Sequence, residues 1–214
     1  MPLGERGGDL KRFLLMLILV GALAYASVAY AAARQIQIDD NFFTPAAPPT
    51  RNVVAGASFQ WQSGAGTVNP HNVRQDSKLF YSGALTTAPI NYSVSASAGT
   101  YHYYCELHGS PTGGMAGVVK VRPVFAASPT GAPFTVTWAL SGTTTGNQFD
   151  VRYRVGTAGT WKLWKNDTAT RTGVFCQNGQ PVQVLPGHTY QFQARSQKDP
   201  TKPSGWSPTL TVNT

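Results

Sequence analysis

The sequence has little charge, cysteine or histidine. Lys, Arg, Asp and Glu make up 12% of the 214 residues, and there are only two Cys and four His. Beyond residue 33 no apolar pattern with a helical period persists along the chain. The low content of charged residues and the missing helical period exclude a helical bundle and a coiled coil.

Turn-forming and β-forming residues are plentiful. The sequence contains 22 Gly and 15 Pro, and Val, Tyr, Trp and Phe occur in short clusters between them. Strands at this spacing, with turn signals between them, predict an all-β protein built of antiparallel sandwiches. The predicted strands cover residues 36–38, 59–61, 72–74, 92–96, 100–105, 117–121, 134–140, 149–155, 161–164, 182–184, 190–196 and 210–212.

Residues 1–33 are interpreted as a signal peptide. A polar stretch ending in Lys11 and Arg12 precedes an uncharged segment, residues 13–33, which starts Leu-rich and ends in small residues suited to cleavage. The alternative is an uncleaved anchor, because the uncharged segment is long enough to cross a hydrocarbon core of about 30 Å. We therefore expect a secreted, periplasmic or envelope protein.

A change of composition around Pro123 predicts a boundary between two domains. A strand-like run ends there and a segment rich in Ala, Ser, Pro and Gly follows. The expected domains are residues 34–123 and 124–214. No motif repeats between them, so we interpret them as two different sandwiches.

The positive charge is interpreted as a solvated surface. The full chain has a formal net charge of +8, and the basic residues are dispersed rather than clustered. An exported protein rarely meets nucleic acid, so we expect no nucleic-acid partner.

Four residues with metal-binding side chains are the strongest functional signal. Cys105, His108 and Met115 lie within eleven positions, and His71 stands upstream in Pro-His-Asn-Val. Two imidazoles, a thiolate and a weak axial thioether form the ligand set of a type 1 copper site, which suits electron transfer. The alternative for Cys105 is a disulfide with Cys176, the usual pairing in an exported protein with two cysteines.

The residues before Cys105 form a predicted strand. Alternation places Tyr101, Tyr103 and Cys105 on one face and directs His102 outward, which leaves His102 out of the site. His188 lies in a turn and is expected to be solvated.

Residues 35–122 resemble a cupredoxin of the plastocyanin and azurin group, a Greek-key β-sandwich. The resemblance rests on Pro-His-Asn-Val at 70–73, Gly-Thr-Tyr-His-Tyr-Tyr-Cys at 99–105, and Cys-x-x-His followed by Gly-Gly-Met at 113–115. It implies that His71, Cys105, His108 and Met115 bind one copper ion, and that the ring of His108 reaches the surface. It also implies that Asn72 ties the two ligand segments together.

The stretch between His108 and Met115 departs from that family, being two residues longer than the plastocyanin pattern. The resemblance therefore does not fix the length of the axial bond from Met115 to the metal or the surface on which a partner protein would dock. Glu106 is expected to be exposed beside the metal, where its charge would favour Cu(II).

Residues 126–214 resemble a fibronectin type III domain, an immunoglobulin-like β-sandwich. The resemblance rests on Trp138, Tyr153, the segment 185–196 and Gly-Trp-Ser-Pro at 205–208. Leu185 and Tyr190 suit the tyrosine corner of such sandwiches. By analogy of fold alone, this half is interpreted as a spacer or binding module.

We therefore expect a blue-copper protein that carries single electrons to a redox partner protein. Association with the cell envelope would occur through residues 124–214 or through an uncleaved leader. The alternative is a copper scavenger or chaperone that does not transfer electrons. An oxidase would need further His ligands, commonly as His-x-His pairs, and the sequence has no such pair. We therefore expect the protein not to be an enzyme.

Overall fold

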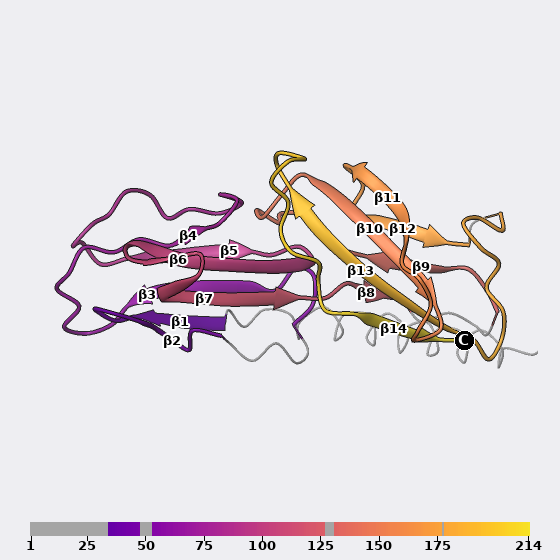
Figure 1. Ribbon diagram of the computed structural model, residues 1–214, viewed down its shortest axis with the longest axis horizontal. Helices are drawn as coiled ribbons and strands as arrows, with labels where there is room; N and C mark the ends of the chain where they lie inside the picture. Colours follow the sequence, from indigo (N-terminus) through magenta and orange to yellow (C-terminus); the bar gives the residue numbers. More distant parts are fainter. Residues whose placement is uncertain (1–33, 48–52, 127–130, 177) are drawn as a thin grey trace, which may run out of the picture. The chain divides into compact units, whose positions relative to one another are not determined.

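The fold is all-β, as predicted (Figure 1). The computed structural model describes residues 34–47, 53–126, 131–176 and 178–214, all within one compact unit, Ala33–Thr214. These residues form strands β1 to β14 and no helix. Among them there is accordingly no helix with the length and apolar character to span a bilayer. The predicted leader, residues 1–33, lies outside the described residues.

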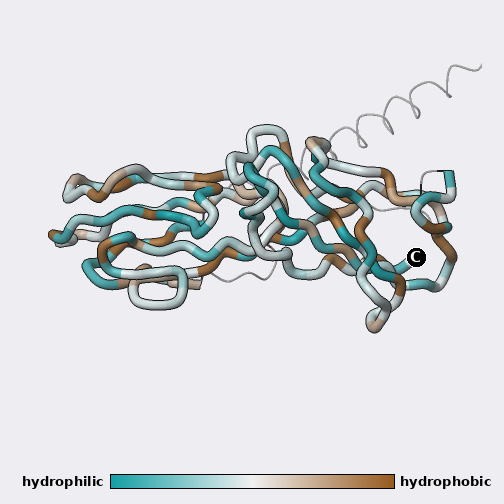
Figure 2. Tube along the Cα trace, turned by 45° about the horizontal axis from the view of Figure 1, so that its top comes forward, coloured by the Kyte–Doolittle hydropathy of each residue, from teal (hydrophilic) through white to brown (hydrophobic). Residues whose placement is uncertain are grey.

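Strands β1 to β7 make two sheets in the first half of the chain. One has the order β2-β1-β3-β5 and the other β4-β6-β7. Alternating hydropathy along the strands, visible in Figure 2, turns one face of each sheet toward a core that includes Trp61 and Tyr103. The strands are β1 (Arg34–Ile38), β2 (Phe43–Thr44), β3 (Ser58–Ser63), β4 (Arg74–Gln75), β5 (Asn91–Ser95), β6 (Gly99–Ser110) and β7 (Gly113–Val121).

One strand pair differs from the antiparallel prediction. β1 pairs with β3 in parallel, with Ile36 opposite Trp61. Parallel pairing requires a long crossover rather than a tight turn, and residues 39–57 supply that length. The short strand β2 within this connection was not predicted.

Strands β8 to β14 make two further sheets, with the orders β12-β9-β8 and β11-β10-β13-β14. Their side chains form a second core cluster, which includes Trp138 and Phe192. The change of composition at Pro123 falls between β7 and β8. The strands are β8 (Val124–Phe125), β9 (Phe134–Thr137), β10 (Gln148–Val155), β11 (Lys162–Thr168), β12 (Thr172–Phe175), β13 (Thr189–Gln197) and β14 (Leu210–Asn213).

The tyrosine corner that the resemblance to fibronectin type III domains implied is present in this half. The Tyr190 hydroxyl accepts a hydrogen bond from the backbone N–H of Leu185 at 2.9 Å and donates one to the Gln183 carbonyl at 3.2 Å. Residues 182–184 lie in this corner and not in a strand, so the strand predicted there is wrong. β8 and β12 were not predicted, since β8 has two residues and β12 begins Thr-Gly.

Buried hydroxyl groups join the two halves. The Tyr101 hydroxyl lies 2.6 Å from Ser196 Oγ, 3.0 Å from Ser97 Oγ and 3.1 Å from Thr145 Oγ1. Tyr101, Ser97, Thr145 and Ser196 are each 0% exposed. Since Tyr101 belongs to β6 and Ser196 to β13, the strand that leads to Cys105 is anchored to the second half.

Tyr101→Phe is expected to lower the free energy of unfolding by about 1–3 kcal/mol, because the buried hydroxyls around it lose a partner. Urea unfolding of the full chain measures the change. Tyr153→Phe is the control, since Tyr153 is also buried and its hydroxyl makes no hydrogen bond within the described residues. Equal losses in both variants would show that the hydrogen bonds of the Tyr101 hydroxyl do not stabilise the protein.

Candidate metal centre

His71 is fixed by its own backbone. Its N–H donates to the Thr86 carbonyl at 2.9 Å and its carbonyl accepts from the Thr86 N–H at 3.0 Å, an isolated antiparallel bridge. The preceding Pro70 restricts its own backbone, because a proline ring fixes φ. His71 therefore enters the site from a loop whose position is set by two main-chain hydrogen bonds.

Cys105 and His108 lie in a bulge of the β6–β7 hairpin. The strands pair Tyr104 with Ala116 and then, after a register shift, Gly109 with Gly114. Residues 105–108 of one strand therefore face Met115 alone on the other. A bulge of this kind redirects side chains out of the regular ladder, and here it places Met115 opposite both predicted ligands.

Glycine permits the tight return of this hairpin. A Cβ atom at Gly109 would lie within 3.0 Å of the Met115 backbone, and Gly114 has a φ of 76°, a left-handed conformation that favours glycine. The extra length between His108 and Met115 is therefore taken up by hairpin pairing through Ser110 and Gly113. The sequence predicted a loop here, whereas β6 continues through Ser110.

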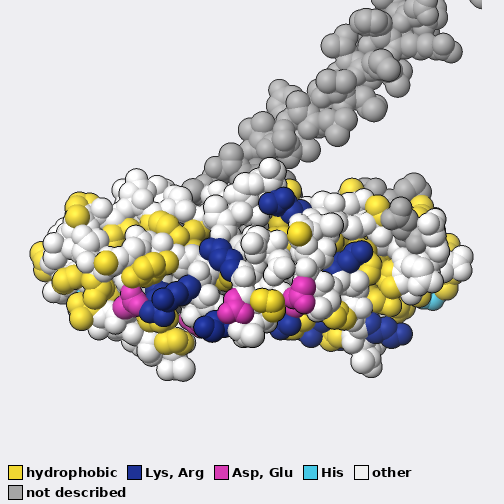
Figure 3. Space-filling view, turned by 90° about the horizontal axis from the view of Figure 1, so that it is seen from above, with side chains coloured by type: hydrophobic (Ala, Val, Ile, Leu, Met, Phe, Trp, Pro, Cys, Tyr) yellow, Lys and Arg dark blue, Asp and Glu magenta, His cyan; other side chains and the backbone are white. Residues whose placement is uncertain are grey.

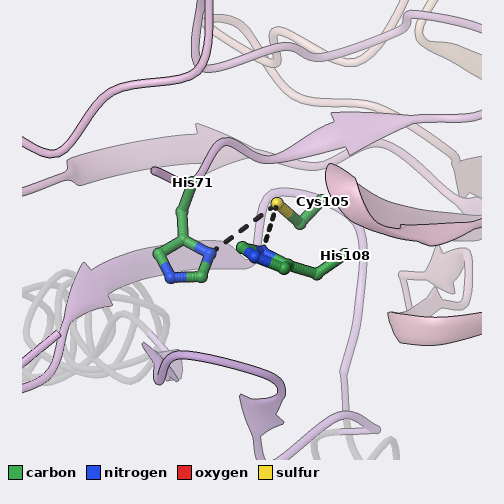
Figure 4. A group of neighbouring side chains, drawn as sticks. All are labelled: His71, Cys105 and His108. Atoms are coloured by element: carbon green, nitrogen blue, oxygen red, sulfur yellow. Dashed lines mark hydrogen bonds between the residues drawn. The ribbon is translucent and has the colours of Figure 1, made fainter. Parts of the chain in front are cut away.

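The two imidazoles converge on the thiol sulfur (Figure 4). The distances from Cys105 Sγ are 3.7 Å to His71 Nδ1 and 3.6 Å to His108 Nδ1. The candidate ligand atoms of the three residues all lie within 4.8 Å of one another. Cys105 is 0% and His71 1% exposed, whereas His108 is half-buried.

The donor set fits a single small metal ion. Three donors at this mutual spacing can bind one ion with little rearrangement, and thiolate with imidazole suits copper. Met115 is 1% exposed and belongs to the same core cluster as Cys105. Axial ligation by its thioether stays a prediction.

Asp40 faces the far side of the His71 ring. Its Oδ1 lies 3.6 Å from His71 Nε2 and accepts hydrogen bonds from the N–H groups of Val68 and Asn69 at 2.8 and 3.1 Å. His71 Nε2 is buried and makes no hydrogen bond within the described residues. Burial lowers the pKa of His71, so its neutral, metal-binding form is favoured.

Asn72 ties the two ligand segments together, as the resemblance implied. Its Oδ1 accepts the backbone N–H of Glu106 at 2.9 Å, and its amide donates to Glu106 Oε2 at 2.6 Å. The residues that follow His71 and Cys105 are thus joined directly. This pairing fixes the separation of the two ligand loops.

Glu106 differs from the exposed charge that the sequence predicted. It is half-buried and forms an ion pair with Arg74, and Tyr81 donates a hydrogen bond to it at 3.1 Å. Hydrogen bonding by the Arg74 guanidinium lowers the pKa of this carboxyl group. Because Arg74 offsets the charge of Glu106, this carboxylate would affect a bound metal less than an unpaired carboxylate would.

The remaining expectations have mixed outcomes. Cys105 and Cys176 are both free and buried, so the disulfide alternative is wrong. Tyr101 and Tyr103 are buried and His102 is exposed, as alternation predicted. Sequence reasoning missed Asp40, Arg74 and Tyr81, since single polar residues distant along the chain carry no motif.

Comparison with known proteins adds little to this geometry. No protein-family model and no curated protein matches the chain. Among solved structures, the FN1-FN3 domains of chicken CNTN1 match with 9% identity over 85% of this chain and 68% of that chain, with a TM-score of 0.30. At that TM-score the likeness carries no structural argument.

Proposed function

We propose that this chain binds one copper ion through His71, Cys105, His108 and Met115 and carries single electrons. The observation that supports the proposal is the convergence of one thiol and two imidazoles, with candidate ligand atoms within 4.8 Å of one another. This ligand set is typical of type 1 copper sites in cupredoxins. Residues 34–123 would then be the cupredoxin domain, and we place the protein outside the cytoplasm.

Bound copper would supply a reversible one-electron couple, and the protein would hold its ligands nearly fixed. His71 is held by the bridge to Thr86, and the segment after Cys105 is held by Asn72. Burial of Cys105 excludes water from the sulfur. Ligands that move little between two charge states favour fast electron exchange, and the half-buried His108 offers the route to a partner protein.

Redox cycling tests the proposal. The protein loaded with Cu(II) should lose its visible absorption on addition of ascorbate and regain it fully with ferricyanide over repeated cycles. Voltammetry should show one reversible one-electron wave. A copper scavenger would instead release Cu(I) to a chelator during the first reduction, and that outcome would contradict the role as an electron carrier.

Met115→Leu is expected to keep a coloured site and to raise its reduction potential, because loss of a weak donor disfavours Cu(II). Met115→Gln should lower the potential. Voltammetry of the three proteins measures both shifts. Identical potentials would show that the Met115 thioether does not reach the metal.

Asp40→Asn is expected to weaken Cu(II) binding by about 10–100-fold, as for other partners of metal-bound histidines. The potential should rise, since the carboxylate near His71 Nε2 stabilises the higher metal charge. Asp39→Asn is the matched control, because the Asp39 carboxylate accepts hydrogen bonds from the side chains of Gln37 and Thr44 and none from the candidate ligands. Competition titration with a Cu(II) chelator measures the affinities, and equal values for both variants would exclude a role for Asp40.

A further inference from the structure

The outer face of the sheet β11-β10-β13-β14 carries alternating arginine and tryptophan side chains. Arg152 Cζ lies 4.8 Å from the Trp161 ring centroid and 4.1 Å from that of Trp206. Arg154 lies 4.7 Å from Trp161, and Arg195 lies 4.7 Å from Trp206. We call Arg154, Trp161, Arg152, Trp206 and Arg195 the Arg–Trp ladder.

Neighbouring side chains hold the ladder arginines in place. Gln193 Oε1 accepts from Arg152 Nε and Nη2 at 2.9 and 2.6 Å, and Gln191 Oε1 accepts from Arg154 Nε at 2.7 Å. Arg195 Nε donates to an Asp150 carboxylate oxygen at 2.8 Å. Within the described residues, the Nη groups of Arg154 and Arg195 make no hydrogen bond. These N–H groups are therefore free for a ligand and already oriented.

The ladder has an uncompensated positive charge. Within the described part of the chain, Arg195 is paired with Asp150, whereas Arg152 and Arg154 have no acidic partner within 4.0 Å. The pKa of Arg152 is lowered, first by burial and then by the nearby positive charges of Arg195 and Arg154. The guanidinium groups of the ladder therefore repel one another. On the face drawn in Figure 3, Lys and Arg lie in separate groups, some with Asp or Glu nearby. An anion on the ladder would relieve this repulsion.

The free groups of the ladder indicate the chemistry of the anion. Each tryptophan ring already has two guanidinium groups near it, so these rings are poor platforms for stacking nucleic-acid bases. They also offer little as apolar anchors for a protein partner. What remains is a row of N–H donors along a strand, with Arg152 and Arg154 two residues apart on the same face. Guanidinium groups bind carboxylates in a bidentate manner.

We propose that the Arg–Trp ladder binds a linear acidic polysaccharide whose sugar units carry carboxylates. The free Nη groups of Arg154 and Arg195 would pair with carboxylates along the polymer. Arg152, which is held by Gln193, would add positive charge and a further N–H donor for the sugar hydroxyls. The second half of the chain would thereby attach the protein to an anionic matrix. This binding is independent of copper and goes beyond the proposed electron transfer.

Binding of alginate, a linear polymer of uronic acids, tests the proposal with the metal-free full chain. Biolayer interferometry should show saturable binding to alginate that weakens steeply as salt rises, and none to neutral dextran. Arg152→Gln combined with Arg154→Gln should weaken binding at least about tenfold, since each substitution removes charge-assisted hydrogen bonds. Arg171→Gln combined with Lys202→Gln removes the same charge at exposed positions outside the ladder and should change binding less than about twofold.

Folding of the variants is checked by near-ultraviolet circular dichroism of the tryptophans. Should the double variant unfold, Arg154→Gln alone serves, because Arg154 contacts only Trp161 in the ladder. Absence of alginate binding by the parent protein would overturn the proposal, as would equal losses in ladder and control variants. Equally tight binding of single-stranded DNA with the same arginine dependence would overturn the choice of polysaccharide.

Discussion

Cys105→Ser is expected to abolish the intense visible absorption of the copper-loaded protein. The thiolate supplies the charge-transfer transition, and a serine hydroxyl at the same position cannot replace it. The sheets should stay folded, because Cys105 is one of many side chains in the first core cluster. Titration with Cu(II), followed by absorption spectroscopy, measures the loss.

Cys176→Ser provides the control for this substitution. Cys176 is also a buried free cysteine, but it belongs to the second core cluster. Replacement of Cys176 should leave the absorption unchanged. Retention of the parent spectrum by Cys105→Ser would refute the copper site, and loss of the spectrum in Cys176→Ser would show that Cys176, and not Cys105, binds the metal.

Copper is expected to raise the free energy of unfolding by about 4 kcal/mol when free metal is a thousandfold above Kd, because its candidate ligands converge only in the folded state. The candidate ligands join the His71 loop to the β6–β7 hairpin, which meet through the hydrogen bonds of Asn72. The hydroxyl cluster around Tyr101 links this hairpin to the second half. Copper should therefore raise one common thermal transition, and calorimetry of metal-free and loaded protein measures it.

Two outcomes would contradict this expectation in different ways. A copper-dependent transition beside one that does not respond would show that the halves unfold independently, despite the contact between Tyr101 and Ser196. An equal rise in Cys105→Ser would show that copper acts at another group, such as the exposed His188. Tyr101→Phe weakens the contact between the halves and should therefore make it easier for the common transition to split into one transition for each half.

Local pattern explains what could be predicted from the sequence. The alternation of β6 is a property of adjacent residues, so the burial of Tyr101, Tyr103 and Cys105 followed directly. The approach of His71 to Cys105 spans 34 positions. It could be predicted only because few residue types bind copper and because the motifs resemble those of cupredoxins.

Contacts between distant polar residues could not be predicted in this way. Asp40 faces His71, and Arg74 pairs with Glu106, through side chains that no local period distinguishes from ordinary surface charges. The parallel pairing of β1 with β3 depends on where the chain returns after a long connection. The packing of the whole sandwich sets these features. They adjust the surroundings of the candidate metal ligands, but they do not determine which residues those ligands are.

The most direct test of the copper site is titration of the purified protein with Cu(II), followed by visible absorption. The account predicts an intense thiolate-to-copper band that grows linearly and saturates at one copper per chain. The band should be absent from Cys105→Ser and much weaker in His71→Ala. A weak spectrum of the kind given by nitrogen and oxygen ligands alone, unchanged by the Cys105 substitution, would contradict the account.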